Sequence, residues 1–268
     1  MEEVDGIILI ISCEKHKLTR LKEFGPKSKY YDKWKVIYVI GDLFLDEKYK
    51  LIDNVMYVKC EDSYLHLLKK LVLSLKYLKE CFNIKEGVLR CGDDLIFNEN
   101  NLINFLKSNK YDYYGQSLKS RNNIIEDKDI EFLKTVKYDG FMLNYYKNNQ
   151  NELTDPKHGI NLTLDELNKF LIRPDAWEAP GVIYYISLKS CDILIDTMEK
   201  INYNIFHFDE FSKSYPYIIE DCAVTYIMYY NKINFYDSQK FFKNDVSHVQ
   251  NLDINKIDSI VIHTNKYR

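Results

Sequence analysis

Apolar runs alternate with polar stretches along the chain, and the runs predict the strands of an α/β protein. Residues 6–12 form a continuous apolar, β-branched segment, typical of a strand buried on both faces of a parallel sheet. Residues 35–40 repeat this pattern, and 55–58 predict a third, shorter strand. Later runs predict further strands at 111–115, 182–187 and 260–262.

Apolar positions three or four residues apart predict the helices. The longest such stripe indicates a helix over about 67–82, and it consists of Leu67, Leu68, Leu71, Leu75, Leu78 and Phe82. Glu61, Asp62 and Ser63 offer N-cap chemistry before it. This helix makes the run at Val88 and Leu89 a parallel strand reached by a right-handed crossover. Further helices are predicted after Asn98, over 188–198 and from Glu220.

Two adjacent acids, Asp93 and Asp94, follow Gly92 at the carboxyl end of that predicted strand, and an apolar run comes directly after them. Adjacent carboxylates repel each other, so partial burial of both requires a cation or several hydrogen-bond donors. A hard divalent cation needs only one or two carboxylates when phosphate oxygens complete its coordination. The stretch therefore predicts a metal and nucleotide-diphosphate site. The alternative is a solvated turn, since Gly-Asp-Asp is also good turn chemistry.

The predicted fold is one α/β domain over 1–268, with a mixed, mainly parallel sheet flanked by helices. No Pro/Gly/Ser-rich linker divides the chain, but residues 116–178 lose regular periodicity and are interpreted as a variable acceptor-side insertion. Ser12 and Arg20 are expected beyond the carboxyl end of the first strand, where open α/β sheets bind nucleotides. For Arg20, a solvated helix face is the alternative.

Composition and charge narrow the partners. The formal net charge is -3, which argues against a nucleic-acid partner. The six cysteines are scattered without a Cys-x-x-Cys pair, so neither a zinc site nor a disulfide framework is indicated. The acidic N-terminus and its short apolar run do not match a signal peptide or a membrane span. We therefore expect a soluble, cytoplasmic protein, of a microbe or of a large virus in its host.

Several blocks together resemble a known family. They are Asp62-Ser63-Tyr64-Leu65-His66-Leu67 with Lys70, the stretch from Arg90 to Asn98, and the segments 180–187, 217–224 and 260–263. In this order they resemble the inverting β1,3-glycosyltransferases, which include β1,3-galactosyltransferases, β1,3-N-acetylglucosaminyltransferases and the Fringe enzymes. The chain departs from the family pattern where His66 replaces Asn, Arg90 replaces Lys, and Gly92 replaces the first acid of an acidic triplet; Pro216 also lies earlier than the usual Pro.

The resemblance implies a GT-A fold and a divalent metal, Mn²⁺ or Mg²⁺. It also implies sugar transfer from a UDP-sugar to a hydroxyl of a glycan or other acceptor. Asp94 would bind the metal, Asp93 would contact the donor, and Asp221 would be the general base. His263 would complete the metal ligands, with His248 as the second candidate.

Three further residues are assigned to substrate binding. Asp62 joins Ser12 and Arg20 on the donor side, and Trp177 and Glu220 are placed on the acceptor side. Trp177 could stack on a sugar ring, with a core position as the alternative. The acids at Glu220 and Asp221 also have a structural explanation, because acids stabilise the first turn of a helix.

Two other readings of the function stay open. Paired acids with a metal also serve nucleotidyl or phosphoryl transfer. Gly92 leaves room for a degenerate nucleotide-sugar-binding module without catalysis.

Overall fold

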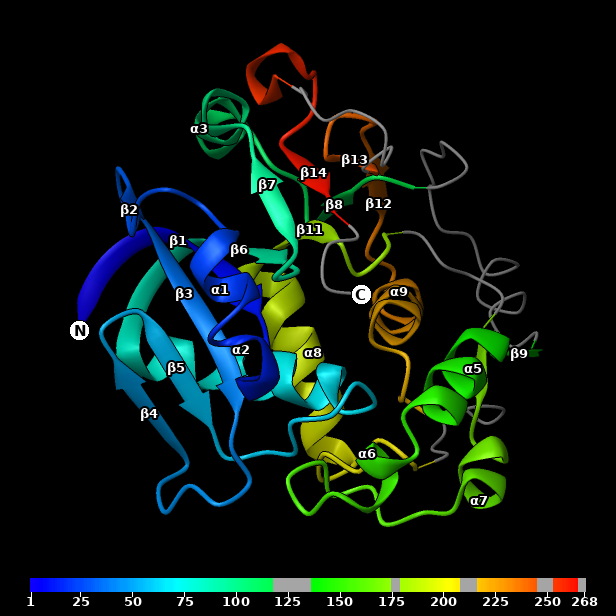
Figure 1. The fold of residues 1–268 in the computed structure, drawn as a ribbon. Helices are drawn as coiled ribbons and strands as arrows, with labels where there is room; N and C mark the ends of the chain where they lie inside the picture. Colours follow the sequence, from blue (N-terminus) through cyan, green and yellow to red (C-terminus); the bar gives the residue numbers. More distant parts are fainter. Residues whose placement is uncertain (118–135, 175–178, 208–215, 245–252, 265–268) are drawn as a thin grey trace.

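The computed structural model describes residues 1–117, 136–174, 179–207, 216–244 and 253–264. Within these ranges nine strands form one sheet, in the order β12-β8-β11-β6-β1-β3-β5-β4 with β2 paired to β3 (Figure 1). The strands are β1 (Glu2–Ile11), β2 (Tyr30–Tyr31), β3 (Trp34–Gly41), β4 (Tyr49–Ile52), β5 (Val55–Val58), β6 (Phe82–Cys91), β8 (Tyr113–Gly115), β11 (Ile183–Ser187) and β12 (Phe235–Asp237).

Four parallel strands, β6, β1, β3 and β5, form the middle of this sheet. Their side chains are buried on both faces at most positions, which is why their sequences read as continuous apolar runs. On one side β11 and β8 continue the sheet in antiparallel pairings, and on the other β4 pairs antiparallel with β5. The prediction of a mixed α/β fold with a largely parallel centre is confirmed.

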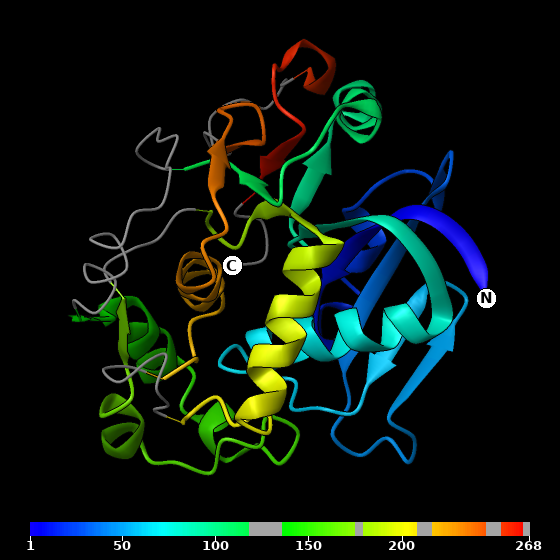
Figure 2. The same cartoon turned by 180° about the vertical axis from the view of Figure 1, so that it is seen from behind.

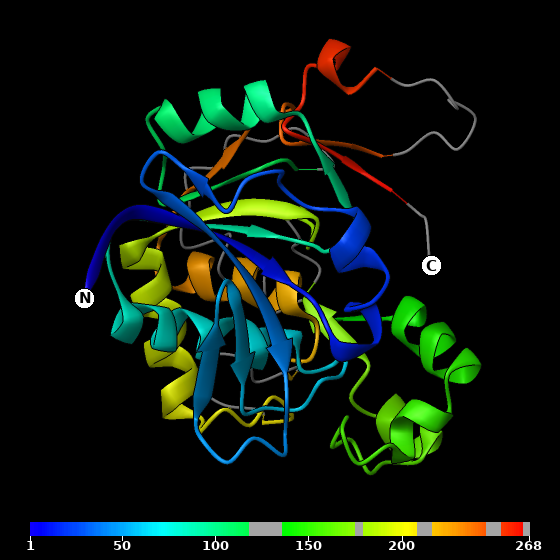
Figure 3. The same cartoon turned by 60° about the vertical axis from the view of Figure 1, so that its left-hand side comes forward.

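Helices cover both faces of the sheet. The helices α2 (Leu67–Cys81), α8 (Leu188–Lys200) and α9 (Glu220–Tyr230) lie on one side, and α3 (Glu99–Lys107) lies on the other (Figure 3). From behind, α8 is seen crossing in front of the sheet beside α2 (Figure 2). Each face has its own apolar core, so the sheet is buried between two layers. The crossover through α2 delivers the chain into β6 parallel to β1, as predicted.

A second, three-stranded sheet lies beyond the carboxyl end of β6. It consists of β7 (Leu95–Phe97), β14 (Val261–His263) and β13 (Phe242–Asn244). In the antiparallel pairing of β14 with β7, His263 stands opposite Leu95. This pairing returns the end of the described chain to the residue that follows Asp94.

The predicted insertion 116–178 is described in part. It contains β9 (Val136–Tyr138), α5 (Gly140–Asn148), α6 (Asn151–Thr154), α7 (Leu164–Asn168) and β10 (Ile172–Pro174), and these helices stand apart from the main sheet in Figure 1. Two short helical turns, η1 (Glu14–His16) and α1 (Arg20–Glu23), follow β1.

One local prediction is wrong. The N-cap of α2 is His66, and no side chain caps it, so the residues Glu61, Asp62 and Ser63 are not its cap. Among the described helices, none combines the length and the apolar character that crossing a membrane requires.

Candidate functional site

The adjacent acids lie at the carboxyl end of β6, next to the carboxyl end of β1. Asp93 and Asp94 directly precede β7 and are 8% and 6% exposed. The prediction that the pair stands at the carboxyl edge of a parallel sheet is confirmed, and this edge is where open α/β sheets place ligands.

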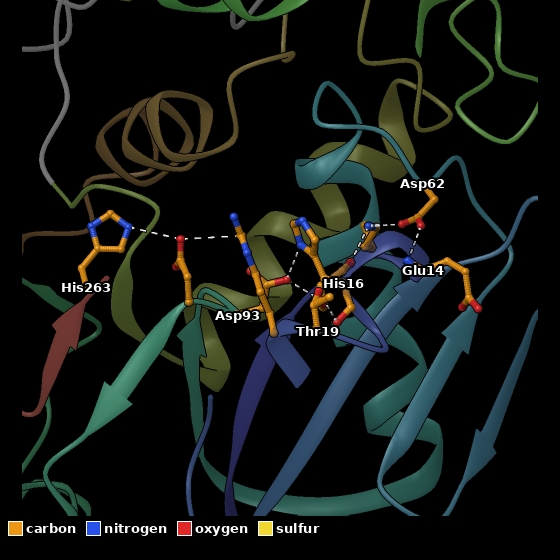
Figure 4. A network of polar contacts seen from close by, with 10 residues as sticks. Glu14, His16, Thr19, Asp62, Asp93 and His263 are labelled. Carbon is orange, nitrogen blue, oxygen red and sulfur yellow. Dashed lines mark hydrogen bonds and ion pairs between the residues drawn. The ribbon is translucent and has the colours of Figure 1, made fainter. Parts of the chain in front are cut away.

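Asp93 is enclosed by three hydrogen-bonding partners from the segment after β1. Its Oδ2 accepts from Ser12 Oγ at 2.7 Å and lies 2.8 Å from His16 Nδ1, and its Oδ1 accepts from Arg20 Nη1 at 2.8 Å (Figure 4). Burial raises the pKa of Asp93, but the hydrogen bonds from His16, Ser12 and Arg20 outweigh it and lower that pKa to about 2. For His16, burial lowers the pKa, but the interactions with Asp93 and Cys13 outweigh burial and raise that pKa to about 9. Asp93 is therefore held as a carboxylate beside two cationic groups.

Asp94 faces a histidine from the other end of the chain. Its Oδ2 lies 3.5 Å from His263 Nε2 and 3.7 Å from Arg20 Nη1. The backbone of Asp94 accepts a hydrogen bond from Thr264 N at 3.0 Å, which fixes β14 against this position. The other ring nitrogen, His263 Nδ1, lies 3.0 Å from Asn244 Oδ1. The amide oxygen of Asn244 can accept a hydrogen bond from Nδ1, which orients the ring so that Nε2 faces Asp94.

This donor set fits a divalent cation. Bonds of about 2.1 Å in octahedral geometry place neighbouring ligand atoms about 3 Å apart, so the separation of Asp94 Oδ2 and His263 Nε2 needs little adjustment. Among the described residues, no group of three or more His, Cys, Asp and Glu side chains could hold a metal. A cation bound here would have Asp94 and His263 as protein ligands.

A third carboxylate, that of Asp221, is connected to this region through the loop that contains Gly181 and Val182. Asp221, in the first turn of α9, accepts a hydrogen bond from Gly181 N at 2.9 Å through its Oδ2. The next residue of that loop, Val182, accepts from Gly92 N at 2.8 Å. Gly92 in turn is so close to Asp94 that an added Cβ would lie 3.1 Å from Asp94 Oδ1. Asp221 is thus connected to the turn that carries Asp94 through Gly181, Val182 and Gly92.

Glu220 has a different environment from its neighbour Asp221. It is 5% exposed, its Oε2 accepts from Arg90 Nη2 at 3.0 Å, and its Oε1 accepts from the Tyr184 hydroxyl. Arg90 also donates to the Gly181 carbonyl through Nη1. A buried carboxylate with both oxygens engaged holds the Gly181 loop in place. This geometry favours a positioning role over the predicted acceptor contact.

Asp62 also has a positioning geometry. Its Oδ2 accepts from Glu14 N at 2.8 Å, and its Oδ1 accepts from Gly41 N at 3.2 Å and from the ammonium of Lys70 (Figure 4). Lys70 is 1% exposed and donates to the Ser12 carbonyl at 2.8 Å. These bonds hold the segment after β1 that encloses Asp93. The donor-binding roles of Ser12, Arg20 and Asp62 stay predictions.

His16 was not predicted as a site residue from the sequence. A faint signal exists, because it comes four residues after Ser12 in a polar segment that leaves the carboxyl end of a buried strand. The Arg90–Glu220 pair was missed as well, since nothing local connects residues 130 positions apart. Two predicted site residues, Trp177 and His248, lie outside the described residues.

Two cavities in the described part of the chain lie away from these side chains. A cavity of about 510 Å³ lies at the amino end of β1, lined by Asp5, Tyr30, Tyr31 and Trp34 among others, and it contains none of the residues above. Because it lies at the opposite end of the parallel strands from the carboxylates, it has no part in the chemistry argued for them.

Comparison with known proteins assigns no family to the chain. No protein-family model matches it, and no curated protein sequence matches it.

Proposed function

We propose that the protein is a metal-dependent inverting glycosyltransferase of GT-A type that moves a sugar from a UDP-sugar to a hydroxyl of a glycan or other acceptor. The observation that carries the proposal is the approach of Asp94 Oδ2 to His263 Nε2 at 3.5 Å, with Asp221 connected to the same site through Gly181. The β1,3 type of linkage rests on the family resemblance alone.

On the donor side, Asp94 and His263 would hold Mn²⁺ or Mg²⁺. The bound cation would supply Lewis-acid stabilisation of the negative charge that develops on the departing diphosphate. Arg20 and His16 add positive charge beside this position, because each is in an ion pair or hydrogen bond with Asp93. The carboxylate of Asp93 partly neutralises this positive charge, and its hydrogen bonds would orient the Arg20 and His16 side chains toward the donor.

On the acceptor side, Asp221 acts as the general base. It takes the proton of the acceptor hydroxyl while the hydroxyl oxygen forms a bond to the anomeric carbon. The bond from that carbon to the diphosphate oxygen breaks, and its electron pair leaves with UDP, so the configuration at the carbon is inverted. Asp221 is oriented for this step by hydrogen bonds from Gly181 N and Cys222 N, both at 2.9 Å.

Two matched substitutions test the proposal. Asp94→Asn should abolish sugar transfer and weaken UDP binding in the presence of Mn²⁺, because the ligand charge is lost. Asp221→Asn should abolish transfer and leave UDP binding unchanged, because the base does not touch the nucleotide. Asp258→Asn serves as the control, since that carboxylate is 75% exposed and lies 3.7 Å from Lys240 Nζ.

The measurements are isothermal calorimetry of UDP with Mn²⁺ and product analysis of reactions with UDP-sugars. Full transfer activity in Asp94→Asn or Asp221→Asn would refute the residue assignment. Release of pyrophosphate in place of UDP would favour nucleotidyl transfer. Failure of UDP to bind the unmodified protein with Mn²⁺ would argue against any nucleotide-sugar enzyme.

A further inference from the structure

An exposed aromatic cluster stands beside the candidate site. It consists of Tyr64, in the segment after β5, and of Phe141 and Tyr145 in α5, and we refer to these three residues as the aromatic platform. Tyr64 is 42% exposed and Phe141 is 65% exposed. The rings of Tyr64 and Tyr145 are stacked with centroids 5.4 Å apart, and the Phe141 ring is tilted against Tyr64 at 6.5 Å.

A short series of contacts connects the platform to the segment that encloses Asp93. The Tyr145 hydroxyl donates to Glu152 Oε2 at 2.9 Å, and Glu152 Oε1 accepts from Lys15 Nζ at 3.5 Å. Lys15 directly precedes His16, whose ring nitrogen contacts Asp93. Figure 3 shows α5 beside the turn that follows β1.

A second link runs through the other side of the platform. Tyr64 lies two residues after Asp62, which accepts a hydrogen bond from the backbone N–H of Glu14 in the same turn. Both links place the platform on the carboxyl side of the sheet, where the donor and the acceptor must meet.

The chemistry of the platform fits one sugar ring. Exposed aromatic planes bind the apolar C–H face of a pyranose by stacking, and hydroxyl groups at the edge of the sugar can bond to polar neighbours. Two exposed rings cover far less than the roughly 800 Å² per partner that a standard protein interface buries. The size of the cluster therefore favours a saccharide over a protein partner.

We propose that the aromatic platform is an acceptor subsite, in which a pyranose ring stacks on Tyr64 and Phe141. The assignment of that sugar to the acceptor rests on the proposed glycosyltransferase function; the sugar-binding site itself does not. Tyr145 supports the platform from beneath, since its hydroxyl is fixed by Glu152.

The test uses the whole chain and three probes, namely methyl β-galactoside, methyl β-glucoside and the methyl β-glycoside of N-acetylglucosamine. Binding is measured by saturation-transfer NMR with irradiation of aromatic protein protons. At least one probe should bind, and Tyr64→Ala and Phe141→Ala should each weaken it by about tenfold or more. Phe141→Trp should preserve binding, because it keeps an aromatic plane.

Tyr236→Ala is the matched control. Tyr236 belongs to another exposed aromatic pair, stacked on Tyr111 with ring centroids 3.6 Å apart, on the edge strand β12. Its loss should leave glycoside binding unchanged. Thermal unfolding of each variant verifies that the protein is folded.

The outcomes separate the two proposals. Absence of saturation transfer to all three probes, with and without UDP and Mn²⁺, would overturn the subsite, and so would equal binding by Tyr64→Ala, Phe141→Ala and the unmodified protein. If the glycosides bind through the platform while UDP with Mn²⁺ does not bind, the sugar site stands and the glycosyltransferase proposal fails.

Discussion

At the scale of single residues, Gly92 is more than a missing acid. Its N–H donates to Val182 O at 2.8 Å, and an added Cβ would lie 3.1 Å from Asp94 Oδ1. Such a contact is tighter than most real Cβ contacts, so Asp94 or the backbone would have to shift. Gly92 therefore gives Asp94 the room to face His263.

This geometry makes Gly92→Asp a poor way to improve the proposed metal site. Although the substitution restores the family's acidic triplet, its Cβ would crowd Asp94 Oδ1, and that carboxylate would have to move by a few tenths of an ångström. We expect no large gain in Mn²⁺ affinity, measured by calorimetric titration.

Gly92→Ala is the control for that titration, because it adds the same Cβ without the charge. Equal weakening in both variants would identify crowding of Asp94 as the cause. A tenfold or larger increase in Mn²⁺ affinity for Gly92→Asp would contradict this account.

His66 provides a pH dependence that is independent of the metal site. The side chain is 4% exposed, and its Nδ1 lies 2.6 Å from Ser63 Oγ. Burial lowers the pKa of His66 from 6.5 to about 4, with the positive charges of Lys69 and Lys70 acting in the same direction and Glu61 opposing. The unfolded chain therefore binds a proton at higher pH than the folded chain does.

The free energy of unfolding should fall as the pH drops from about 6.5 to about 4, by up to about 3 kcal/mol, because protonation then favours the unfolded chain. The measurement is urea unfolding of the unmodified protein and of His66→Asn across this range. The variant should lose this part of the pH dependence while the carboxylates still titrate. If the free energy of unfolding changes with pH in the same way in both proteins, His66 is not the cause of this pH dependence.

The site positions that sequence alone could predict are those with a local signature. Asp93 and Asp94 follow a buried strand, and Asp221 begins an apolar helix, so their positions could be expected. Glu220 could not be separated from Asp221 on the same grounds. The burial of Glu220 in α9 depends on its ion pair with Arg90, which lies in β6.

At the scale of elements, short edge strands account for most of what the sequence did not predict. Central strands such as β1 and β3 are buried on both faces and leave long apolar runs. In contrast, β2 has two residues, while β12 and β13 have three each, which is too short for a period to be recognised. The three-stranded sheet that positions His263 therefore became visible only in the folded chain.

The helix α3 joins this small sheet to the rest of the protein through its cap. A helix was predicted after Asn98, and the Asn98 side chain caps it by accepting from Asn101 N at 3.2 Å. The same side chain donates to the carbonyls of Ile254 and Ile257, at 2.8 and 3.1 Å. One buried amide thus satisfies both a helix end and the segment leading to β14.

Asn98→Ala should lower the free energy of unfolding by about 2–3 kcal/mol, because it removes a cap and two hydrogen bonds to backbone carbonyls. Asn98→Asp keeps the capping oxygen, so its free energy of unfolding should lie between those of Asn98→Ala and the unmodified protein. Asn100→Ala, at an exposed position of the same helix, is the control. The measurement is chemical denaturation, and equal stability of Asn98→Ala and Asn100→Ala would contradict the role of the cap.

At the scale of the whole molecule, the candidate site draws on parts of the chain that lie far apart in sequence. The segment after β1, the turn after β6, the loop before β11, the start of α9 and the end of β14 all contribute. The parallel centre of the sheet was predictable because each strand has its own apolar run. The convergence of Asp94 with His263 was not, since it depends on the pairing of β7 with β14.

Because these distant segments meet at the proposed nucleotide site, binding there should stabilise the whole fold. A ligand that binds only the folded chain at about a hundred times its Kd adds about 2.7 kcal/mol. For a chain of this size that corresponds to a rise in Tm of about 5–10 °C, at roughly 2–4 °C per kcal/mol.

We therefore expect UDP with Mn²⁺ to raise Tm in differential scanning fluorimetry, and UDP with EDTA to have much less effect. Asp94→Asn should remove the dependence on Mn²⁺, whereas Asp221→Asn should keep it, because only the first residue is a proposed metal ligand. An equal rise in Tm with Mn²⁺ and with EDTA would mean that the nucleotide binds without the metal, and the roles of Asp94 and His263 would then be wrong.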